Sequence, residues 1–258
     1  MSSTRHSDTD AAIFVWGETA SPDLSFTPVG GAHEVGLVPV GAVEQHGPHL
    51  PVATDTIIAT AMCERAAAMT GAPVLPAISL GVSYGHGTEL PGTLSLTPAL
   101  LNGIVGQYVH WAALSGLRRL LFVNAHMGNA AALGTATDRL RLERRDVRVG
   151  VVDWWMCDEQ VSEAMLADAA DAHANCAETS VMLAIRPDLV HRDRMLEADD
   201  EDRTADLVFR YTATELSRNG VTGRPSLASA EFGEKLWRLA AEGLAARVRR
   251  GRVEEPPL

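Results

Sequence analysis

The sequence predicts an α/β fold in which helices cover both faces of a mostly parallel sheet. Two observations carry this prediction: short valine-rich apolar runs alternate with longer segments of helical periodicity, and polar loops follow the apolar runs. Hydrophobic residues make up 46% and charged residues 21% of the 258 residues, which is the balance of an ordinary globular protein. No linker rich in Pro, Gly or Ser interrupts the alternation, so we expect one domain over residues 1–258.

Four apolar runs are predicted to be the strands of this sheet. Each run is short, rich in aliphatic residues and followed by small or polar residues, a pattern typical of buried strands. Because helical segments separate them, consecutive strands should be joined by crossovers and lie parallel. The runs cover residues 35–42, 73–81, 118–126 and 147–155.

Five segments are predicted to be helices, because their apolar residues recur at helical spacing. The first begins at an N-cap, Asp55 or Thr54, and ends at Gly71. The acidic run at 197–202 falls between elements and is expected to be a solvated loop. The five helical segments cover residues 55–71, 97–116, 129–145, 203–219 and 232–250.

Charge argues against two classes of partner. A formal net charge of -11 opposes attraction to nucleic acid and to anionic membrane surfaces, so neither is expected as a partner. The arginines within 247–252 are expected to complement the dipole of the last helix and to stay solvated. No stretch reaches the roughly 18 apolar residues of a membrane span.

Cysteine usage and the N-terminal residues indicate the compartment. Cys63, Cys157 and Cys176 form no CxxC pair, and their odd number favours free thiols in a reducing environment. Residues 1–10 are polar, contain no apolar signal core and are expected to be a flexible tail. We therefore expect a cytoplasmic protein.

Polar side chains with metal-binding chemistry follow the predicted strands. Glu44, His46 and His49 come directly after the first strand, and His126 follows the run "LLFVN" at the end of the strand predicted at 118–126. Because ligands of open α/β sheets bind beyond the carboxyl ends of the strands, these side chains should share one edge of the sheet. Asp55, at the start of the next helix, can return to the same point.

Carboxylates and imidazoles are the usual ligands of catalytic zinc, manganese or iron. One residue separates Glu44 from His46, so on an extended segment both side chains point the same way. Asp55 could bridge two ions. A single loop histidine is more often a surface residue than a ligand, but several convergent candidates predict a metal site.

At these residues the sequence resembles the creatininase (creatinine amidohydrolase) family. The hallmark of that family corresponds to "PVGAVEQHGPHLPVATD" at 39–55. The resemblance extends over about residues 35–240 and includes four further stretches: "GVSYGHGTELPGTLSL" (81–96), "VNAHMGN" (123–129), "DAHANCAETSVMLAIRPDLV" (171–190) and "GVTGRPSLASAEFGEKL" (220–236).

The resemblance implies a three-layer α/β/α fold, a centre of two divalent ions (Zn, Mn or Fe), and a homo-oligomer that is often a hexamer. It implies that Glu44, Asp55 and His126 bind one ion. It further implies that His46 and the shared Asp55 bind the other. Two more residues are carried over: His173 as an active-site histidine near the substrate, and Glu178 as a ligand of the second ion or a proton-transfer group.

Two departures from the family pattern bear on the site. Creatininase proper has a tyrosine and a metal-binding glutamate after the histidine matched by His126, whereas this chain has Met127 and Gly128. The second ion must then use another carboxylate or a water, which argues against creatinine as the substrate. Asn175 and Cys176 also replace common family residues, and an inert buried thiol is the alternative to a contact by Cys176.

Five residues are candidates for substrate contacts. The loop at 81–96 supplies Ser83 and His86, and Cys176 is a third candidate. Trp154 and Trp155 end a predicted strand and could provide a flat wall for a planar ring. Neighbours on a strand point to opposite faces, so at most one of them should face the site, and core packing is the alternative for either.

Two rival functions can be weighed against metal-dependent hydrolysis. "GVSYG" (81–85) matches the nucleophile-elbow pattern, with Ser83 as nucleophile, but Pro91 and Gly92 stand where the required helix should run. A metal that only holds loops for ligand binding is the second rival. Structural zinc sites are usually closed and cysteine-rich, so a carboxylate-rich site favours catalysis.

The expected function is therefore hydrolysis of a non-peptide or unusual C–N amide bond in a small molecule by metal-activated water. His173 or Glu178 would protonate the leaving nitrogen. The resemblance implies three substrates: creatinine, a formamide of a pyrimidine ribotide, and the C-terminal dipeptide of a modified precursor peptide. The strand-end motifs contain no Lys or Arg to bind a phosphate, so a neutral amide is favoured, with the precursor-peptide peptidase as the alternative.

Overall fold

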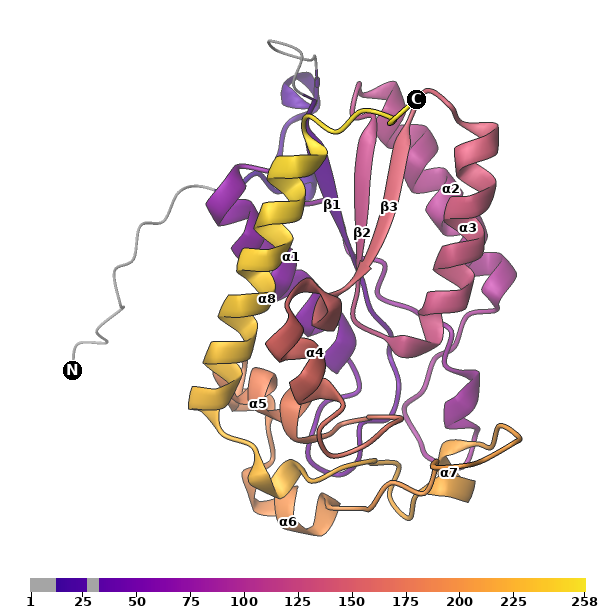
Figure 1. The fold of residues 1–258 in the computed structure, drawn as a ribbon, viewed down its shortest axis with the longest axis vertical. Helices are drawn as coiled ribbons and strands as arrows, with labels where there is room; N and C mark the ends of the chain where they lie inside the picture. Colours follow the sequence, from indigo (N-terminus) through magenta and orange to yellow (C-terminus); the bar gives the residue numbers. More distant parts are fainter. Residues whose placement is uncertain (1–12, 27–32) are drawn as a thin grey trace, which may run out of the picture.

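Three parallel strands form the central sheet of the computed structural model, which describes residues 13–26 and 33–258 (Figure 1). The strands are β1 (Val35–Val40), β2 (Arg119–Asn124) and β3 (Arg148–Asp153), and their order in the sheet is β1-β2-β3. The register places Val35 opposite Arg119 and Arg119 opposite Arg148, so the carboxyl ends of all three strands meet at one edge. The predicted parallel sheet is confirmed.

Helices cover both faces of the sheet, which confirms the three-layer α/β/α prediction (Figure 1). Along each strand, successive side chains alternate between two apolar clusters. Leu37 and Val123 pack in one cluster with α1 (Thr54–Thr70) and α8 (Ala230–Gly251). Val38 and Phe122 pack in the other cluster with α2 (Pro98–Leu114) and α3 (Ala130–Glu143).

The strand predicted at 73–81 is not a regular strand. This segment runs beside β1 and makes only isolated bridges at Val74 and Ile78. The amide groups of Leu75 and Ile78 donate to carbonyls of β1, both at 2.9 Å. Pro73 and Pro76 carry no N–H, so a continuous ladder cannot form and the segment remains an irregular edge.

The helices predicted at 55–71, 97–116 and 129–145 correspond to α1, α2 and α3. Gly71 ends α1 in the left-handed conformation, with φ of 70°. The hydroxyl of Thr97 accepts a hydrogen bond from the amide of Leu100 and caps α2. The last predicted helix, at 232–250, corresponds to α8, which begins two residues earlier after its N-cap Ser229.

The helix predicted at 203–219 is wrong. Only α7 (Ala213–Leu216) forms there, and Thr212 and Glu215 close it as a capping box. The apolar residues before it, Val208 and Phe209, are 86% and 72% exposed, so this segment has no core face to bury. Three helices were not predicted: α4 (Glu159–Met165), α5 (Cys176–Ile185) and α6 (Met195–Ala198).

Two expectations about charged segments are also corrected. The run at 197–202 is not simply a solvated loop, because Asp200 is buried and accepts hydrogen bonds from the amide of Arg218 and the hydroxyl of Ser217. In the C-terminal stretch, Arg247 donates to the carbonyls of Met156 and Cys157 rather than remaining solvated. These anchors tie loops to the helices because buried carbonyls and carboxylates need donors.

Two further observations bear on expectations from the sequence. Among residues 13–26 and 33–258, no helix combines the length and the apolar character that a bilayer crossing requires.

Cys63, Cys157 and Cys176 are all free thiols, and burial raises the pKa of Cys157 to about 11. The flexible tail predicted at 1–10 lies outside the described residues.

Candidate metal centre

Five side chains converge where the strands end. Glu44 and His46 lie in the loop after β1, and His126 lies in the loop after β2. Asp55 and Glu178 lie in the first turns of α1 and α5, where the helix dipole favours a negative charge. The parallel sheet thus brings together every residue that the resemblance assigns to the two ions.

The ligand atoms form three groups: one consists of Glu44, His46 and His173, and the other two share Asp55. Glu44, Asp55 and His126 offer atoms that all lie within 4.8 Å of one another, and so do His46, Asp55 and Glu178. Asp55 belongs to both groups, which is the arrangement of a carboxylate that bridges two ions. All five side chains are buried.

Backbone carbonyls determine which nitrogen of each histidine faces the cluster. Nδ1 of His46 donates to the carbonyl of Glu44 at 3.1 Å, and Nε2 of His126 donates to the carbonyl of Val82 at 2.9 Å. A carbonyl can only accept, so the hydrogen of each neutral ring lies on the nitrogen that points away. The other nitrogen of each ring therefore presents a lone pair to the cluster, as metal-binding histidines do.

These lone pairs face carboxylate oxygens across short distances. Nε2 of His46 lies 3.3 Å from Oδ1 of Asp55, and Nδ1 of His126 lies 3.2 Å from Oε1 of Glu44. Three buried atoms of the cluster have no hydrogen-bond partner within the described residues: Oε2 of Glu44, Nε2 of His46 and Oδ2 of Asp55. Acceptors placed against acceptors require a cation between them, so the residues present fit divalent ions.

The pKa values of His46 and His126 are both raised by the negative charges of the neighbouring carboxylates. Burial alone would lower the pKa of His46, but Asp55 and Glu44 raise it to about 10. For His126, burial is likewise outweighed by Glu44 and Asp55, which raise its pKa to about 9. Without metal, protons occupy the positions that cations would otherwise take.

Glu178 differs from the other carboxylates because it sits near its point of titration. Burial and the charges of Asp55 and Glu44 raise the pKa of Glu178 to about 7, against the lowering effect of His46. One of its oxygens accepts a hydrogen bond of 2.7 Å from the amide of Ala174. Ala174 has a φ of 52°, a strained conformation for a residue other than glycine.

Two more histidines cover the exposed side of the cluster. Nδ1 of His173 lies 3.7 Å from Oε1 of Glu44, and Nε2 of His86 lies 3.1 Å from Oε2 of Glu44. Their rings are 4.5 Å apart and their side chains are 16% and 14% exposed, whereas Glu44 is 1% exposed. His86 and His173 are therefore the histidines beside the cluster that solvent reaches.

Comparison with known proteins assigns the chain to a family. The family description "Creatinine amidohydrolase" matches residues 25–248. The chain belongs to the creatininase family. Family membership makes it a hydrolase of carbon–nitrogen bonds.

Several members of the creatininase family are similar over most of their length. A mycofactocin precursor peptide peptidase of Mycolicibacterium smegmatis is 37% identical over 83% of this chain and 84% of its own. A creatinine amidohydrolase of Pseudomonas putida is 32% identical over 86% of this chain and 90% of its own. A crystal structure of creatinine amidohydrolase superposes with a TM-score of 0.81 at 29% identity, covering 95% of this chain and all of that one.

Gly128, the departure from the creatininase pattern, is explained by packing. A Cβ at this position would overlap the carbonyl of Val82 and the ring of His126. A glutamate cannot fit there unless the carbonyl of Val82 and the ring of His126 shift. The carboxylate that completes the second group comes instead from Glu178, on a different element of the fold.

Ser83 is not placed as a nucleophile. Its hydroxyl is buried and lies 3.4 Å from Nε2 of His126, on the side that points away from the cluster. A 3-10 turn, Tyr84–His86, follows it instead of the long helix of a nucleophile elbow. The serine thus touches a ligand of the cluster rather than open space.

Four residues singled out in the sequence lie elsewhere. Nε2 of His49 pairs with the hydroxyl of Thr179 at 2.8 Å, so His49 is not part of any of the ligand groups. Trp154 is completely buried and Trp155 is 8% exposed, both within an apolar cluster of the core. The sheet ends at Asp153 and a 3-10 turn begins at Trp154, so the alternation of a strand does not apply to these two rings. The fourth, Cys176, begins α5, and its amide donates to Asp168.

Two residues that support the site were not predicted. The side chain of Gln45 contacts His86 and His173, and the side-chain oxygen of Asn124 accepts from the amide of His126. Both lie within the matched motifs, Gln45 between two ligands and Asn124 two residues before His126. This position inside the motifs is the signal in the sequence that could have identified Gln45 and Asn124 as supporting residues.

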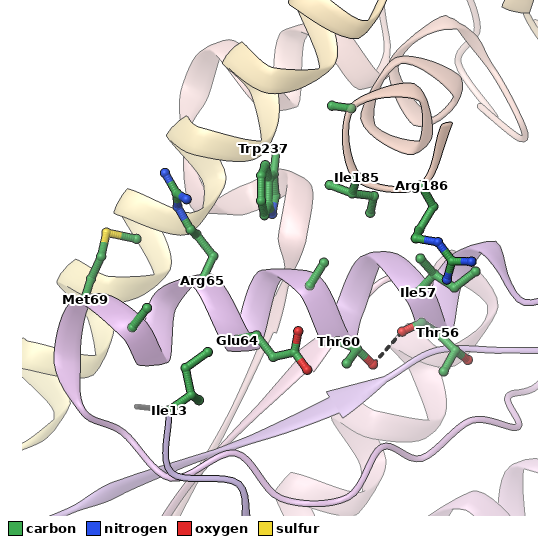
Figure 2. A pocket seen from close by; sticks show the side chains of 13 residues that line it. Ile13, Thr56, Ile57, Thr60, Glu64, Arg65, Met69, Ile185, Arg186 and Trp237 are labelled. Atoms are coloured by element: carbon green, nitrogen blue, oxygen red, sulfur yellow. Dashed lines mark hydrogen bonds between the residues drawn. The ribbon is translucent and has the colours of Figure 1, made fainter. Parts of the chain in front are cut away.

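A separate groove lies on the outer side of α1, between α1, α8 and the end of α5 (Figure 2). It encloses about 840 Å³ and is walled by apolar side chains, among them Ile57, Ile185 and Trp237. The guanidinium of Arg65 stacks 5.1 Å above the ring of Trp237. None of the residues that line this groove belongs to the metal-ligand groups.

Proposed function

We propose that the protein hydrolyses an amide bond with two divalent cations held at the ends of the strands. Glu44, Asp55 and His126 would hold one cation, and His46, Asp55 and Glu178 the other. The observation that carries the proposal is the opposition of imidazole lone pairs and carboxylate oxygens in a buried cluster. Similar solved structures include a manganese form and a zinc form of creatininase, which supports either metal.

Divalent cations supply Lewis acidity, which makes hydroxide available from water at neutral pH and polarises a carbonyl. The chain supplies proton transfer. Nε2 of His173 donates to the carbonyl of Gln45 at 2.7 Å, so Nδ1 is left as an acceptor on the cluster side. Glu178 has a pKa of about 7 only while no cation is bound, so as a cation ligand it would be ionised, and Nδ1 of His173 would take up a proton and release it to a departing nitrogen.

Similarity favours a peptide amide as the substrate. Relatives that are 34% to 37% identical are named mycofactocin precursor peptide peptidases, whereas the creatinine amidohydrolase is 32% identical. We therefore propose a peptide bond of a small precursor peptide as the first class of substrate. This changes the expectation from the sequence, which favoured a small neutral amide because the strand-end motifs contain no Lys or Arg.

A cyclic small amide is the second candidate. This candidate is supported by the superposition of the chain on the full length of a creatinine amidohydrolase structure, with a TM-score of 0.81. Gly128 argues against creatinine itself, because the carboxylate expected at that place in creatininase proper has no room in this chain. Both candidates require the same cluster and the same chemistry.

The test combines metal analysis with substrate screening. Protein purified without chelator is analysed for zinc, manganese and iron, then incubated with a peptide library, creatinine and formamides while product amines are followed by mass spectrometry. We expect about two ions per chain and cleavage of peptides that a chelator abolishes. Metal-loaded protein that cleaves none of these amides would overturn the proposed function, and fastest cleavage of creatinine would overturn the peptide assignment alone.

A further inference from the structure

We propose that Gln45 is a positioning residue that determines which ring nitrogen of His86 carries the hydrogen. The inference rests on the proposed function, because His86 borders the proposed metal centre. Gln45 is buried between two proposed ligands, Glu44 and His46, and its carboxamide points toward the two partly exposed histidines. Its carboxamide has no group that takes a proton from water at neutral pH.

Two backbone groups determine the orientation of the Gln45 carboxamide. The amide of Gly47 donates to Oε1 at 3.0 Å, and Nε2 donates to the carbonyl of Gly220 at 3.0 Å. A backbone N–H can only donate and a carbonyl can only accept, so exchanging the oxygen and nitrogen would oppose like groups at both ends. The carboxamide therefore presents its remaining N–H to the histidines.

His86 is the only one of the two histidines that can accept this N–H. Nε2 of His173 already donates to the carbonyl of Gln45, so its 3.2 Å approach to the carboxamide nitrogen brings two donors together and is not a hydrogen bond. Nδ1 of His86 lies 2.9 Å from the same nitrogen. It accepts the hydrogen bond, and the hydrogen of His86 must lie on Nε2.

The tautomer gives His86 a defined role. The hydrogen-bearing Nε2 of His86 lies 3.1 Å from Oε2 of Glu44 without forming a hydrogen bond to it, so this nitrogen is a donor and not a metal ligand. Beside it, Nδ1 of His173 is an acceptor. A donor and an acceptor on the exposed side of the cluster complement the carbonyl and the N–H of a neutral amide.

The surrounding loop holds the carboxamide in place. Gly220 has a φ of 81°, and a Cβ there would overlap the carboxamide of Gln45. Only glycine allows the loop to approach so closely in that conformation. Glycine at this position thus leaves the space that the carboxamide occupies, and its two backbone hydrogen bonds fix the orientation.

The decisive measurement is the nitrogen NMR spectrum of zinc-loaded protein labelled with 15N-histidine. The variant His86→Asn identifies the signals of His86. In the wild type we expect an unprotonated Nδ1 and a protonated Nε2. Gln45→Glu replaces the donor by an acceptor and should move the hydrogen to Nδ1, whereas Gln107→Glu, at an exposed position on α2, should leave the signals unchanged.

Kinetics then separates positioning from general support of the fold. Gln45→Glu should lower kcat/KM by about 10- to 100-fold, as is typical when a supporting residue of a metal site is lost. If Gln45 acts through His86, adding Gln45→Glu to His86→Ala should cause no further loss. A protonated Nδ1 of His86 in the wild type overturns the proposal, and so does a full additional loss in the double variant. The NMR readout needs no turnover, so it stands apart from any failure of the proposed function.

Discussion

Nε2 of His46 and Oδ1 of Asp55 face each other at 3.3 Å in the buried cluster. Because the hydrogen of the neutral His46 ring is used toward the carbonyl of Glu44, both facing atoms are acceptors. Such an arrangement is stable only with positive charge between the two atoms. In the proposed function a metal ion meets this need, and a proton meets it when metal is absent.

Asp55→Ala should remove both ions, because Asp55 belongs to the ligand group of each proposed ion. We expect the metal content to fall from about two ions per chain to nearly none, and kcat/KM to fall by more than about 100-fold, beyond the effect of losing a supporting residue. Elemental analysis and amide hydrolysis provide the measurement. Asp138→Ala, on the exposed surface of α3, is the matched control.

Retention of one tightly held ion by Asp55→Ala would contradict the bridging role. The mechanism would then need only a single ion, held by Glu44 and His126 or by His46 and Glu178. Loss of metal in the Asp138→Ala control would instead indicate a general defect in folding.

Metal uptake by chelator-treated protein should release protons near neutral pH. The pKa values of about 10 for His46 and about 9 for His126 are raised, so both rings are charged in the metal-free protein and must lose a proton to bind an ion. The apparent affinity should rise about tenfold per pH unit for each proton displaced. Calorimetry in two buffers of different ionisation enthalpy counts the protons.

The same raised pKa values make a prediction for stability. Because the folded pKa of His46 exceeds its ordinary value of 6.5, the metal-free protein has the full His46–Asp55 contribution below about pH 6.5 and loses it as the pH rises towards 10. Thermal unfolding should show this loss in chelated protein and not in zinc-loaded protein. Equal pH profiles for the two forms would show that no proton replaces the metal.

Ser83→Ala should have a small effect. The hydroxyl of Ser83 lies 3.4 Å from Nε2 of His126, which already donates to the carbonyl of Val82. We expect less than about a tenfold change in zinc affinity and in kcat/KM, at or below the low end for supporting residues of metal sites. A serine nucleophile would instead lose nearly all activity, so steady-state kinetics of this variant separates the two mechanisms.

Asp200→Asn should destabilise the protein at neutral pH and have less effect in acid. Burial raises the pKa of Asp200, but Arg203, the amide of Arg218 and Ser217 outweigh it and hold the pKa at about 2. A lowered folded pKa contributes stability that is present above about pH 4 and is lost as the pH falls through 2. Since Arg203 is partly exposed, solvent screening limits the contribution to on the order of 1 kcal/mol.

Urea unfolding of the wild type and of Asp200→Asn between pH 2 and pH 7 provides the measurement. The difference in free energy of unfolding between the two proteins should shrink as the pH falls from 4 to 2. A difference that stays constant with pH would show that the carboxylate charge does not hold the loop.

Much of the fold could be predicted because the relevant signals are local. Apolar spacing identifies α1, α2, α3 and α8, and Gly71 marks the end of α1. The predicted N-cap at Asp55 or Thr54 is wrong, because both residues lie inside α1 and its N-cap is Ala53. Errors arose where local pattern and tertiary burial disagree. Residues 203–211 carry apolar side chains that remain exposed, and the prolines at 73 and 76 interrupt an otherwise apolar edge.

The sequence by itself determined the ligand types, their order along the chain and their position at strand ends. It could do so because the motif at 39–55 and the alternation of strands and helices are patterns of residues close together in the chain. Only the tertiary structure excluded His49, buried both tryptophans and placed Gln45 against His86 and His173. It also placed Glu178 beside His46 and Asp55, where the family resemblance had left two roles open for it. These outcomes depend on contacts between residues far apart in the sequence, such as His49 and Thr179, which are 130 positions apart. Such contacts form only when the helices pack on the sheet, and no local pattern specifies them.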